Sequence, residues 1–231
     1  MKNAIFATGA IAALLLGACS GAFAQEKPTL LKENLPKEAI CLVCSQNGEE
    51  HGAEKPAGAV VYKGKTYYFC AKKEIEAFLK DPEAFIPAPL PRLAPGFTLK
   101  NLAGEPVSFA ELSKDRVLLV DFWATWCAPC IKAMPELQAL HTRFAPTEKF
   151  SVVGISLDEE GAKKVSPFLA RQKTKYTYPM LLDSGDTWQK WGVKGLPSLL
   201  LVKDGQILHH WTGKIDPKEV EKVVASTLKQ D

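Results

Sequence analysis

Residues 117–137 read VLLVDFWATWCAPCIKAMPEL, and this stretch determines which class of fold to expect. Its first six residues, 117–122, are a nearly continuous apolar run, which predicts a strand buried on both faces. From Ala128 onward, apolar residues return at the spacing of a helix: Ile131, Met134, Leu137 and Leu140. The pattern predicts a buried strand leading into a helix, with Cys127 in the first helical turn and Cys130 about one turn further along.

Cys127 stands where a helix favours negative charge. Unpaired N–H groups and the positive end of the helix dipole stabilise a thiolate there, so we expect Cys127 to be exposed and to be the attacking sulfur. Pro129 suits a first turn, where no hydrogen-bond donor is missed. The short separation from Cys130 keeps the two sulfurs within reach of a disulfide. The pair is therefore predicted to open and close as a redox couple.

Two structural roles are the alternatives for this cysteine pair. A zinc site would need further ligands, and this half of the chain offers His141, His209 and His210 without a motif around them. A stabilising disulfide between Cys127 and Cys130 would close too short a loop to constrain the unfolded chain much. The redox interpretation is therefore preferred.

The motif VDFWATWCAPC followed by MPEL resembles the thioredoxin superfamily, and within it the TlpA-like extracytoplasmic thiol:disulfide oxidoreductases. The resemblance covers residues 93–229 and implies an α/β fold, a thioredoxin-like three-layer sandwich with a mixed central sheet. It also implies that Cys127 and Cys130 are catalytic. Pro197, in VKGLPSLLLV, corresponds to the cis proline that faces the cysteines in such folds.

Asp121 and Glu159 are both candidates for the acid–base residue that the resemblance implies. Asp121 lies six residues before Cys127 and matches the buried acid of thioredoxin itself, where TlpA-like proteins often carry Asn. Glu159 follows a predicted strand at 150–157 and matches by position the acid of the reductive members. A partly buried carboxylate there would shuttle the proton of Cys130, and the alternative is an exposed acidic loop.

Four tryptophans lie around the predicted site. Trp123 and Trp126 flank the cysteines and either form a surface for docking a partner or pack beside the strand. Trp188 and Trp191 are spaced for one face of a helix and are predicted to belong to the core.

The chain begins with MKNAIFATGAIAALLLGAC, in which one Lys precedes an apolar run too short to span a bilayer and a set of small residues. Residues 1–24 are therefore predicted to be an export signal. The sequence LGAC at 16–19 resembles a lipobox and would leave Cys19 as a lipidated N-terminus, which we favour; AFA at 22–24 would instead release a soluble protein. Either outcome places the protein in the periplasm or elsewhere outside the cytoplasm, where disulfides persist.

The composition is that of a globular protein, with 46% hydrophobic and 24% charged residues. The formal net charge of +3 comes without a basic stripe, so nucleic acid is not an expected partner. After the export signal, no second apolar segment is long enough to cross a membrane. The remaining length suits one ordinary domain and a small one.

Residues 26–86 are predicted to form the small domain, of α+β type. Residues 60–62 and 66–69 flank a Lys-Gly-Lys turn and predict a hairpin, while 72–79 has the apolar spacing of a short helix. The pattern resembles YHS/TRASH-type modules, which are cysteine-bearing domains associated with heavy-metal handling.

This second resemblance implies that Cys41, Cys44 and Cys70 are metal ligands, and thiolates suit Cu(I) or Zn(II). The family often supplies another cysteine four residues after YYFC, where this chain has Glu74. The fourth ligand is therefore open between His51, Glu74 and water.

Two other roles remain open for the same cysteines. Cys41 and Cys44 could form a disulfide, with Cys70 acting as a small buried hydrophobic residue. Alternatively, that pair could exchange disulfides with Cys127 and Cys130, because tethering raises their effective concentration.

Residues 87–96, PAPLPRLAPG, are predicted to be a linker before the thioredoxin-like domain at 97–231. Four prolines make this segment stiff, extended and unable to join a sheet, although it could also pack along a surface as an ordered connector. The later elements expected from periodicity and turn signals are a hairpin at 97–109, helices at 161–171 and 187–191, a hairpin at 199–211 and a final helix ending near 229.

The predicted function is that of an exported, membrane-anchored thiol:disulfide oxidoreductase. Cys127 would attack a disulfide of an extracytoplasmic protein and Cys130 would resolve the mixed disulfide, without a cofactor. The resemblance implies the reducing direction, supplied by a membrane thiol donor and used in cytochrome c maturation or copper-site assembly. The alternative is a metal-binding protein or metallochaperone whose thioredoxin-like domain maintains its own thiols.

Overall fold

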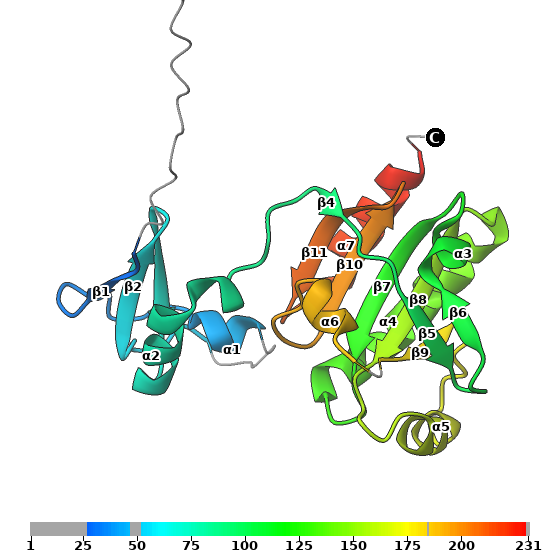
Figure 1. Ribbon diagram of the computed structural model, residues 1–231, viewed down its shortest axis with the longest axis horizontal. Helices are drawn as coiled ribbons and strands as arrows, with labels where there is room; N and C mark the ends of the chain where they lie inside the picture. The colour runs from blue at the N-terminus through cyan, green and yellow to red at the C-terminus, as the bar shows by residue number, and fades with distance from the viewer. Residues whose placement is uncertain (1–26, 47–51, 184, 230–231) are drawn as a thin grey trace, which may run out of the picture.

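The computed structural model describes residues 27–46, 52–183 and 185–229. The predicted export signal, Cys19 and His51 lie outside these residues. The described strands form two separate sheets, one of three strands early in the chain and one of eight strands later (Figure 1). In the part of the chain that the structure describes, no helix combines the length and hydropathy needed to span a bilayer.

The first unit is a three-stranded antiparallel sheet with short helices beside it. Its elements are β1 (Thr29–Leu31), α1 (Leu42–Gln46), β2 (Gly58–Tyr62), β3 (Lys65–Phe69), α2 (Lys72–Lys80) and a 3-10 helix (Pro82–Ala84). Strands β2 and β3 are the predicted hairpin, and Lys63 and Gly64 between them both have positive φ, as a tight hairpin turn requires. The core of this unit is small and consists of Val60, Tyr62, Phe69, Ile75 and Phe78.

The proline-rich segment at 87–96 contributes a short strand to the second sheet. The prediction that this segment is unable to join a sheet is therefore wrong. Arg92 and Leu93 form β4 (Arg92–Leu93), which pairs antiparallel with β11 (Gln206–Thr212) at the edge of the sheet. An edge strand tolerates neighbouring prolines, because only one side of its backbone needs hydrogen bonds. Pro91 and Pro95 therefore bracket the paired residues without interrupting the sheet.

The second unit is an eight-stranded mixed sheet in the order β4-β11-β10-β7-β8-β9-β5-β6. Its remaining strands are β5 (Thr98–Asn101), β6 (Pro106–Ser108), β7 (Val117–Trp123), β8 (Phe150–Ser156), β9 (Met180–Leu182) and β10 (Ser198–Lys203). Strands β7 and β8 run parallel, whereas β10 pairs with both β7 and β11 in antiparallel fashion. The mixed sheet predicted from the sequence is confirmed.

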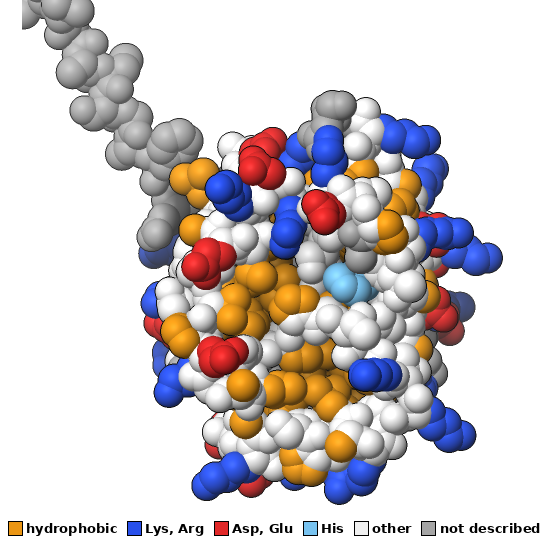
Figure 2. All heavy atoms as spheres, turned by 90° about the vertical axis from the view of Figure 1, so that its right-hand side faces the viewer, with side chains coloured by type: hydrophobic (Ala, Val, Ile, Leu, Met, Phe, Trp, Pro, Cys, Tyr) orange, Lys and Arg blue, Asp and Glu red, His pale blue; other side chains and the backbone are white. Residues whose placement is uncertain are grey.

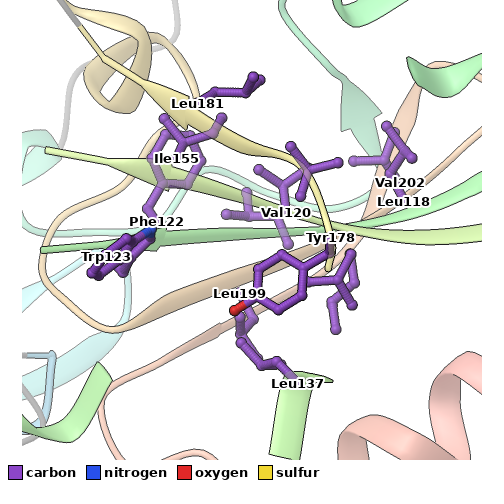
Figure 3. Packing of buried hydrophobic residues seen from close by; sticks show 14 of the residues in the cluster. Leu118, Val120, Phe122, Trp123, Leu137, Ile155, Tyr178, Leu181, Leu199 and Val202 are labelled. Carbon is purple, nitrogen blue, oxygen red and sulfur yellow. The ribbon is translucent and has the colours of Figure 1, made fainter. Parts of the chain in front are cut away.

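Helices cover this sheet and exclude water from its central strands. They are α3 (Phe109–Ser113), α4 (Ala128–Phe144), α5 (Ala162–Ala170), α6 (Thr187–Lys190) and α7 (Pro217–Leu228). Every residue of β7 and β8 is buried, and α4 packs on β8 and against α7. Figure 3 shows side chains of β7 packed with residues from neighbouring strands and with Leu137 of α4. Burial of both faces of β7 explains the nearly continuous apolar run at residues 117–122.

Charged side chains surround hydrophobic patches on the face turned to the viewer in Figure 2. Lys and Arg occur around the margin of this face together with Asp and Glu, and hydrophobic side chains gather in hollows between them. A mixed-sign surface of this kind is the normal exterior of a soluble globular domain.

Candidate active site

Cys127 and Cys130 lie where β7 gives way to α4, as the sequence predicts, and they form a disulfide. Their Cα atoms are 5.3 Å apart, and the Cys130 N–H donates a hydrogen bond of 3.3 Å to Cys127 Sγ. This contact places a backbone dipole of the first helical turn on the sulfur, which stabilises a thiolate there when the disulfide opens.

The expected exposure of Cys127 is wrong: the residue is only 5% exposed, and Cys130 is 1% exposed. Both cysteines belong to the buried core cluster, and Cys127 lies in the wall of a groove of about 890 Å³. The groove is lined by residues from the turn before α4, the end of β8 and the segment before β10: Trp126, Cys127, Ala128, Pro129, Leu157, Glu159, Asp183, Gly185, Trp188, Val193, Lys194, Gly195 and Leu196. A partner must therefore enter this groove to reach the sulfur.

Pro197 lies at the same end of the sheet, and its bond to Leu196 is cis. Ser198, the next residue, pairs with Phe122 near the end of β7. Leu196 lines the groove together with Cys127. The structure thus brings Pro197 and the cysteine pair to one end of the fold, although they are separated by 67 or more positions in the sequence.

Asp121 is buried within β7, two residues before the strand ends. Burial raises its pKa from 3.8 to about 8. Among the residues that the structure describes, none offers a hydrogen bond to Asp121 Oδ2. A buried carboxyl group with a pKa in this range can exchange a proton near neutral pH.

Glu159 is exposed, which agrees with the predicted alternative of an exposed acidic loop and not with a partly buried carboxylate. The neighbouring acid, Asp158, is the buried one. It is held by Thr125, in the loop before Cys127, which donates two hydrogen bonds to the Asp158 carboxylate, from N at 2.9 Å and from Oγ1 at 2.6 Å. Glu159 consequently points outward and lines the groove. The sequence places both acids after β8 but does not show which one the loop holds.

The tryptophans divide between packing and the groove. Trp123 and Trp191 are fully buried, while Trp126 is 69% exposed at the groove. Trp188 is half-buried: it packs against the core, as predicted, and it also lines the groove. Lys194 also lines the groove, and its place there could not be predicted because a single lysine in a loop carries no pattern.

The AhpC/TSA family model matches residues 91–210 of the chain, which include both cysteines, Pro197 and the whole groove. The chain belongs to the AhpC/TSA family. This match covers half of the chain and begins just before β4, so the three-stranded unit lies outside it.

Proteins similar in sequence to this chain carry the names of redox proteins. The chain is 32% identical over 132 residues to the thioredoxin-like protein YneN of Bacillus subtilis, covering 56% of this chain and 75% of YneN. It is 28% identical over 131 residues to the thiol-disulfide oxidoreductase ResA of Bacillus thuringiensis, covering 56% of this chain and 73% of ResA.

The thioredoxin domain of a thiol-disulfide oxidoreductase from Bacteroides vulgatus superposes with a TM-score of 0.50 at 27% identity, covering 58% of this chain and 96% of that domain. The fold, the cysteine pair and the named relatives all indicate the same activity. This AhpC/TSA protein is a thioredoxin-like disulfide oxidoreductase.

The three-stranded unit brings together the other predicted site residues. Cys41 precedes α1, Cys44 lies within it and Cys70 follows β3, yet their sulfur atoms all lie within 4.8 Å of one another. All three are free thiols in the structure, with Cys44 Sγ 3.5 Å from Cys70 Sγ. Glu74 Oε2 joins this cluster, at 3.5 Å from Cys70 Sγ and 3.6 Å from Cys41 Sγ.

The chemistry of the cluster fits a metal ion better than a redox pair. Burial raises the pKa of Cys44, and burial also raises the pKa of Cys70 to about 11. Thiols of this kind are poor nucleophiles, because the thiolate is the reactive form. Three converging sulfurs are the donor set that Zn(II) and Cu(I) prefer, so Cys41, Cys44 and Cys70 are suited to hold such an ion.

Proposed function

We propose that this protein is an exported reductase of protein disulfides. The observation that carries the proposal is the Cys127–Cys130 disulfide at a strand-to-helix junction in the wall of an open groove. An extended protein segment can lie in a groove of this kind and present its disulfide to Cys127. The reducing direction is supported by the resemblance to TlpA-like proteins.

The reaction takes place in two thiol–disulfide exchanges. In the first, the Cys127 thiolate attacks one sulfur of the partner's disulfide, and the other partner sulfur leaves and takes up a proton. In the second, Cys130 loses its proton and attacks Cys127 Sγ, which releases the second partner thiol and closes the Cys127–Cys130 disulfide. The partner gains two electrons and two protons, and a thiol donor at the membrane then returns the protein to its dithiol form.

Asp121 is the proposed acceptor for the proton of Cys130. Burial raises the pKa of Asp121 to about 8, so this carboxyl group can take up and release a proton at mildly alkaline pH. Glu159 is exposed at the groove, where an entering partner would meet its carboxylate. Pro197 keeps the role that the thioredoxin resemblance implies, opposite the cysteines.

The cellular setting of the proposal follows from the sequence. Residues 1–24 contain the export signal, and cleavage before Cys19 leaves this residue as a lipidated N-terminus that keeps the protein at the outer face of a membrane. The partners are extracytoplasmic proteins with disulfides, in cytochrome c maturation or in the preparation of copper-binding cysteines.

Covalent trapping tests the reductase proposal. A Cys130→Ser variant keeps the attacking sulfur and loses the resolving one, so we expect it to accumulate mixed disulfides with partners that a reductant releases. Cys127→Ser is the matched control and should trap none. Equal trapping by both variants would contradict the assignment of Cys127 as nucleophile.

The direction of the reaction is tested by the reduction potential. A reductase should lie near the value of thioredoxin, about −270 mV, and far from the strongly oxidising value of DsbA, about −120 mV. A measured potential at the oxidising end would replace reduction with oxidation in the proposal.

A second candidate function, favoured by the sulfur cluster, is metal binding by the three-stranded unit. We propose that this unit is a YHS/TRASH-like domain in which Cys41, Cys44 and Cys70 hold Zn(II) or Cu(I). The redox domain would keep these thiols reduced. Helix α1, which contains Cys44, ends at Gln46, whose carbonyl accepts a hydrogen bond of 3.4 Å from Thr212 Oγ1. Thr212 pairs with Ser198, the residue after Pro197, so the cysteine-bearing helix contacts the second unit next to the proposed redox site.

Metal titration of the full chain tests this second function. A Cys127→Ser/Cys130→Ser background removes the redox thiols, so that any bound Zn(II) or Cu(I) reports on the cluster. Replacing Cys44 with Ser as well should abolish stoichiometric binding. Absence of binding by the reduced background protein would remove the metal-binding candidate.

A further inference from the structure

We infer that Glu74 is the fourth ligand of the cysteine cluster, so that the cluster forms a tetrahedral Cys3Glu site suited to Zn(II) rather than to Cu(I). This inference rests on the proposed metal binding and specifies the geometry and the class of ion. From the sequence, the fourth ligand is open between His51, Glu74 and water.

Three of the six distances within this ligand set match the edges of a tetrahedral zinc site. With Zn–S bonds of about 2.3 Å and a Zn–O bond of about 2.1 Å, the tetrahedral angle separates sulfur from oxygen by about 3.6 Å and sulfur from sulfur by about 3.8 Å. Glu74 Oε2 lies 3.5 Å from Cys70 Sγ and 3.6 Å from Cys41 Sγ. Cys44 Sγ lies 3.5 Å from Cys70 Sγ. Glu74 Oε2 therefore stands at ligand separation from Cys41 and Cys70. The three sulfurs lie within 4.8 Å of one another without Glu74, so a bound ion would have to draw the carboxylate closer to Cys44.

The position of Glu74 in α2 directs its carboxylate to the sulfurs. Glu74 lies in the first turn of this helix, four residues after Cys70, and its side chain is half-buried. Lys72 and Lys73 adjoin it in sequence, but Glu74 forms no ion pair with any residue in the described ranges. The hydrogen-bond partners that the structure gives this carboxylate are the thiols of Cys41 and Cys70.

Charge favours a divalent ion at this cluster. Three thiolates and one carboxylate carry four negative charges, which a dication offsets better than the single charge of Cu(I). The N-terminal end of α2 adds a favourable dipole beside Cys70 and Glu74. A carboxylate oxygen is a hard ligand that Zn(II) accepts readily, whereas Cu(I) is selected by soft sulfur ligands and gains little from it.

The four proposed metal ligands come from separate segments of the three-stranded unit, which are otherwise held together by its small hydrophobic core. Cys41 and Cys44 are contributed by the start of α1, Cys70 by the end of β3 and Glu74 by α2. An ion bound by all four would join these elements, which suits a unit whose buried core has five residues.

The test uses the full chain in the Cys127→Ser/Cys130→Ser background, with Zn(II), Co(II) and Cu(I) as probes. Glu74→Ala removes the oxygen ligand, Glu74→Cys supplies a fourth sulfur, and Glu76→Ala is the matched control on an exposed position of the same helix. Zn(II) affinity is measured by competition with a chelator, and Co(II) absorption reports the coordination geometry independently of activity.

We expect Glu74→Ala to lower Zn(II) affinity at least tenfold, since even outer-shell partners contribute about 10- to 100-fold. Glu74→Cys should restore the affinity and add a sulfur-to-Co(II) charge-transfer contribution. Cu(I) affinity should be the same in Glu74→Ala and the background protein, which also shows that the cluster is folded. Glu76→Ala should change nothing.

Three results would overturn the inference. Unchanged Zn(II) affinity and Co(II) spectrum in Glu74→Ala would remove Glu74 as a ligand while leaving the cysteine site intact. If Glu74→Ala lost Zn(II) and Cu(I) binding to the same extent, the proposed preference of the site for Zn(II) over Cu(I) would be overturned. Failure of the background protein to bind any of the three ions would remove the metal site itself.

Discussion

Ser198 of β10 lies opposite Phe122 of β7 in the antiparallel register of the second sheet. This pairing brings two loops to one end of the molecule: the loop from β7 to α4, with the cysteine pair, and the segment before β10, with Leu196 and Pro197. The groove along Cys127 is the space between these loops and the end of β8. The sheet register therefore determines the geometry of the proposed site.

Asp158→Asn should loosen the loop that leads to Cys127. Asp158 accepts hydrogen bonds from Thr125 N, Thr125 Oγ1 and Ser156 Oγ, and it is buried. Weakening such a buried set costs about 1–3 kcal/mol of unfolding free energy. Urea unfolding of the oxidised protein measures this loss, and Glu159→Gln is the matched control because Glu159 is exposed. A loss of equal size in both variants would contradict the assigned role of Asp158.

Asp121 should make the folded protein less stable as the pH rises. Burial raises its pKa from 3.8 to about 8, so the native state keeps a proton that the unfolded chain releases between about pH 4 and about pH 8. Stability contributed by this proton is fully present below the lower value and is lost as pH rises to the upper one, by up to about 1.4 kcal/mol per pH unit. Asp121→Asn, which does not titrate, should flatten the dependence of urea unfolding on pH in this window. An unchanged slope in the variant would contradict the raised pKa.

Asp121→Asn should also slow the second exchange step. The variant cannot take the proton of Cys130, and general-base assistance contributes roughly 10²- to 10⁴-fold in enzymes. Stopped-flow reduction of a disulfide-bearing protein should show normal formation of the mixed disulfide and slow release of the reduced product. Raising the pH should partly restore the variant, because Cys130 then ionises without help. A variant that releases product at the normal rate would exclude Asp121 as the acceptor.

The elements around the cysteines could be predicted because each is encoded within one continuous segment. The apolar run of β7 and the helical spacing of α4 each depend on residues close in sequence. Strands β1, β4 and β9 were not predicted, because two or three residues carry no period and pair only where a partner strand is available.

The site was only partly predictable for a related reason. The cysteine pair and Pro197 follow from local motifs, but which of Asp158 and Glu159 is buried depends on Thr125, 33 residues away. The same separation of 33 residues divides Cys41 from Glu74, whose contact the sequence left as one option among three. Contacts of this range depend on how separate elements within one unit pack against each other, which no local motif encodes.

Trp126→Ala should weaken the reaction with protein partners and leave small disulfides unaffected. The Trp126 side chain is 69% exposed at the groove, where an entering segment would cover it. Burial of an aromatic ring on binding contributes up to about 3 kcal/mol, so we expect kcat/KM for a protein disulfide to fall roughly tenfold or more. Leu93→Ala is the matched control, because Leu93 is 77% exposed and lies outside the groove. Equal loss with a small disulfide such as oxidised glutathione would indicate an effect on Cys127 instead of docking.

Zinc should stabilise the three-stranded unit and leave the eight-stranded unit unchanged. A ligand at 100 times its dissociation constant adds about 2.7 kcal/mol to the stability of the form that binds it. In the Cys127→Ser/Cys130→Ser background, hydrogen exchange should therefore slow by roughly 100-fold in β2, β3 and α2 when Zn(II) is added, provided those amides exchange through unfolding of the unit. EDTA should reverse the protection, and a further Cys44→Ser substitution should prevent it. Protection that is equal in both sheets, or that survives Cys44→Ser, would place the bound ion somewhere other than the cysteine cluster.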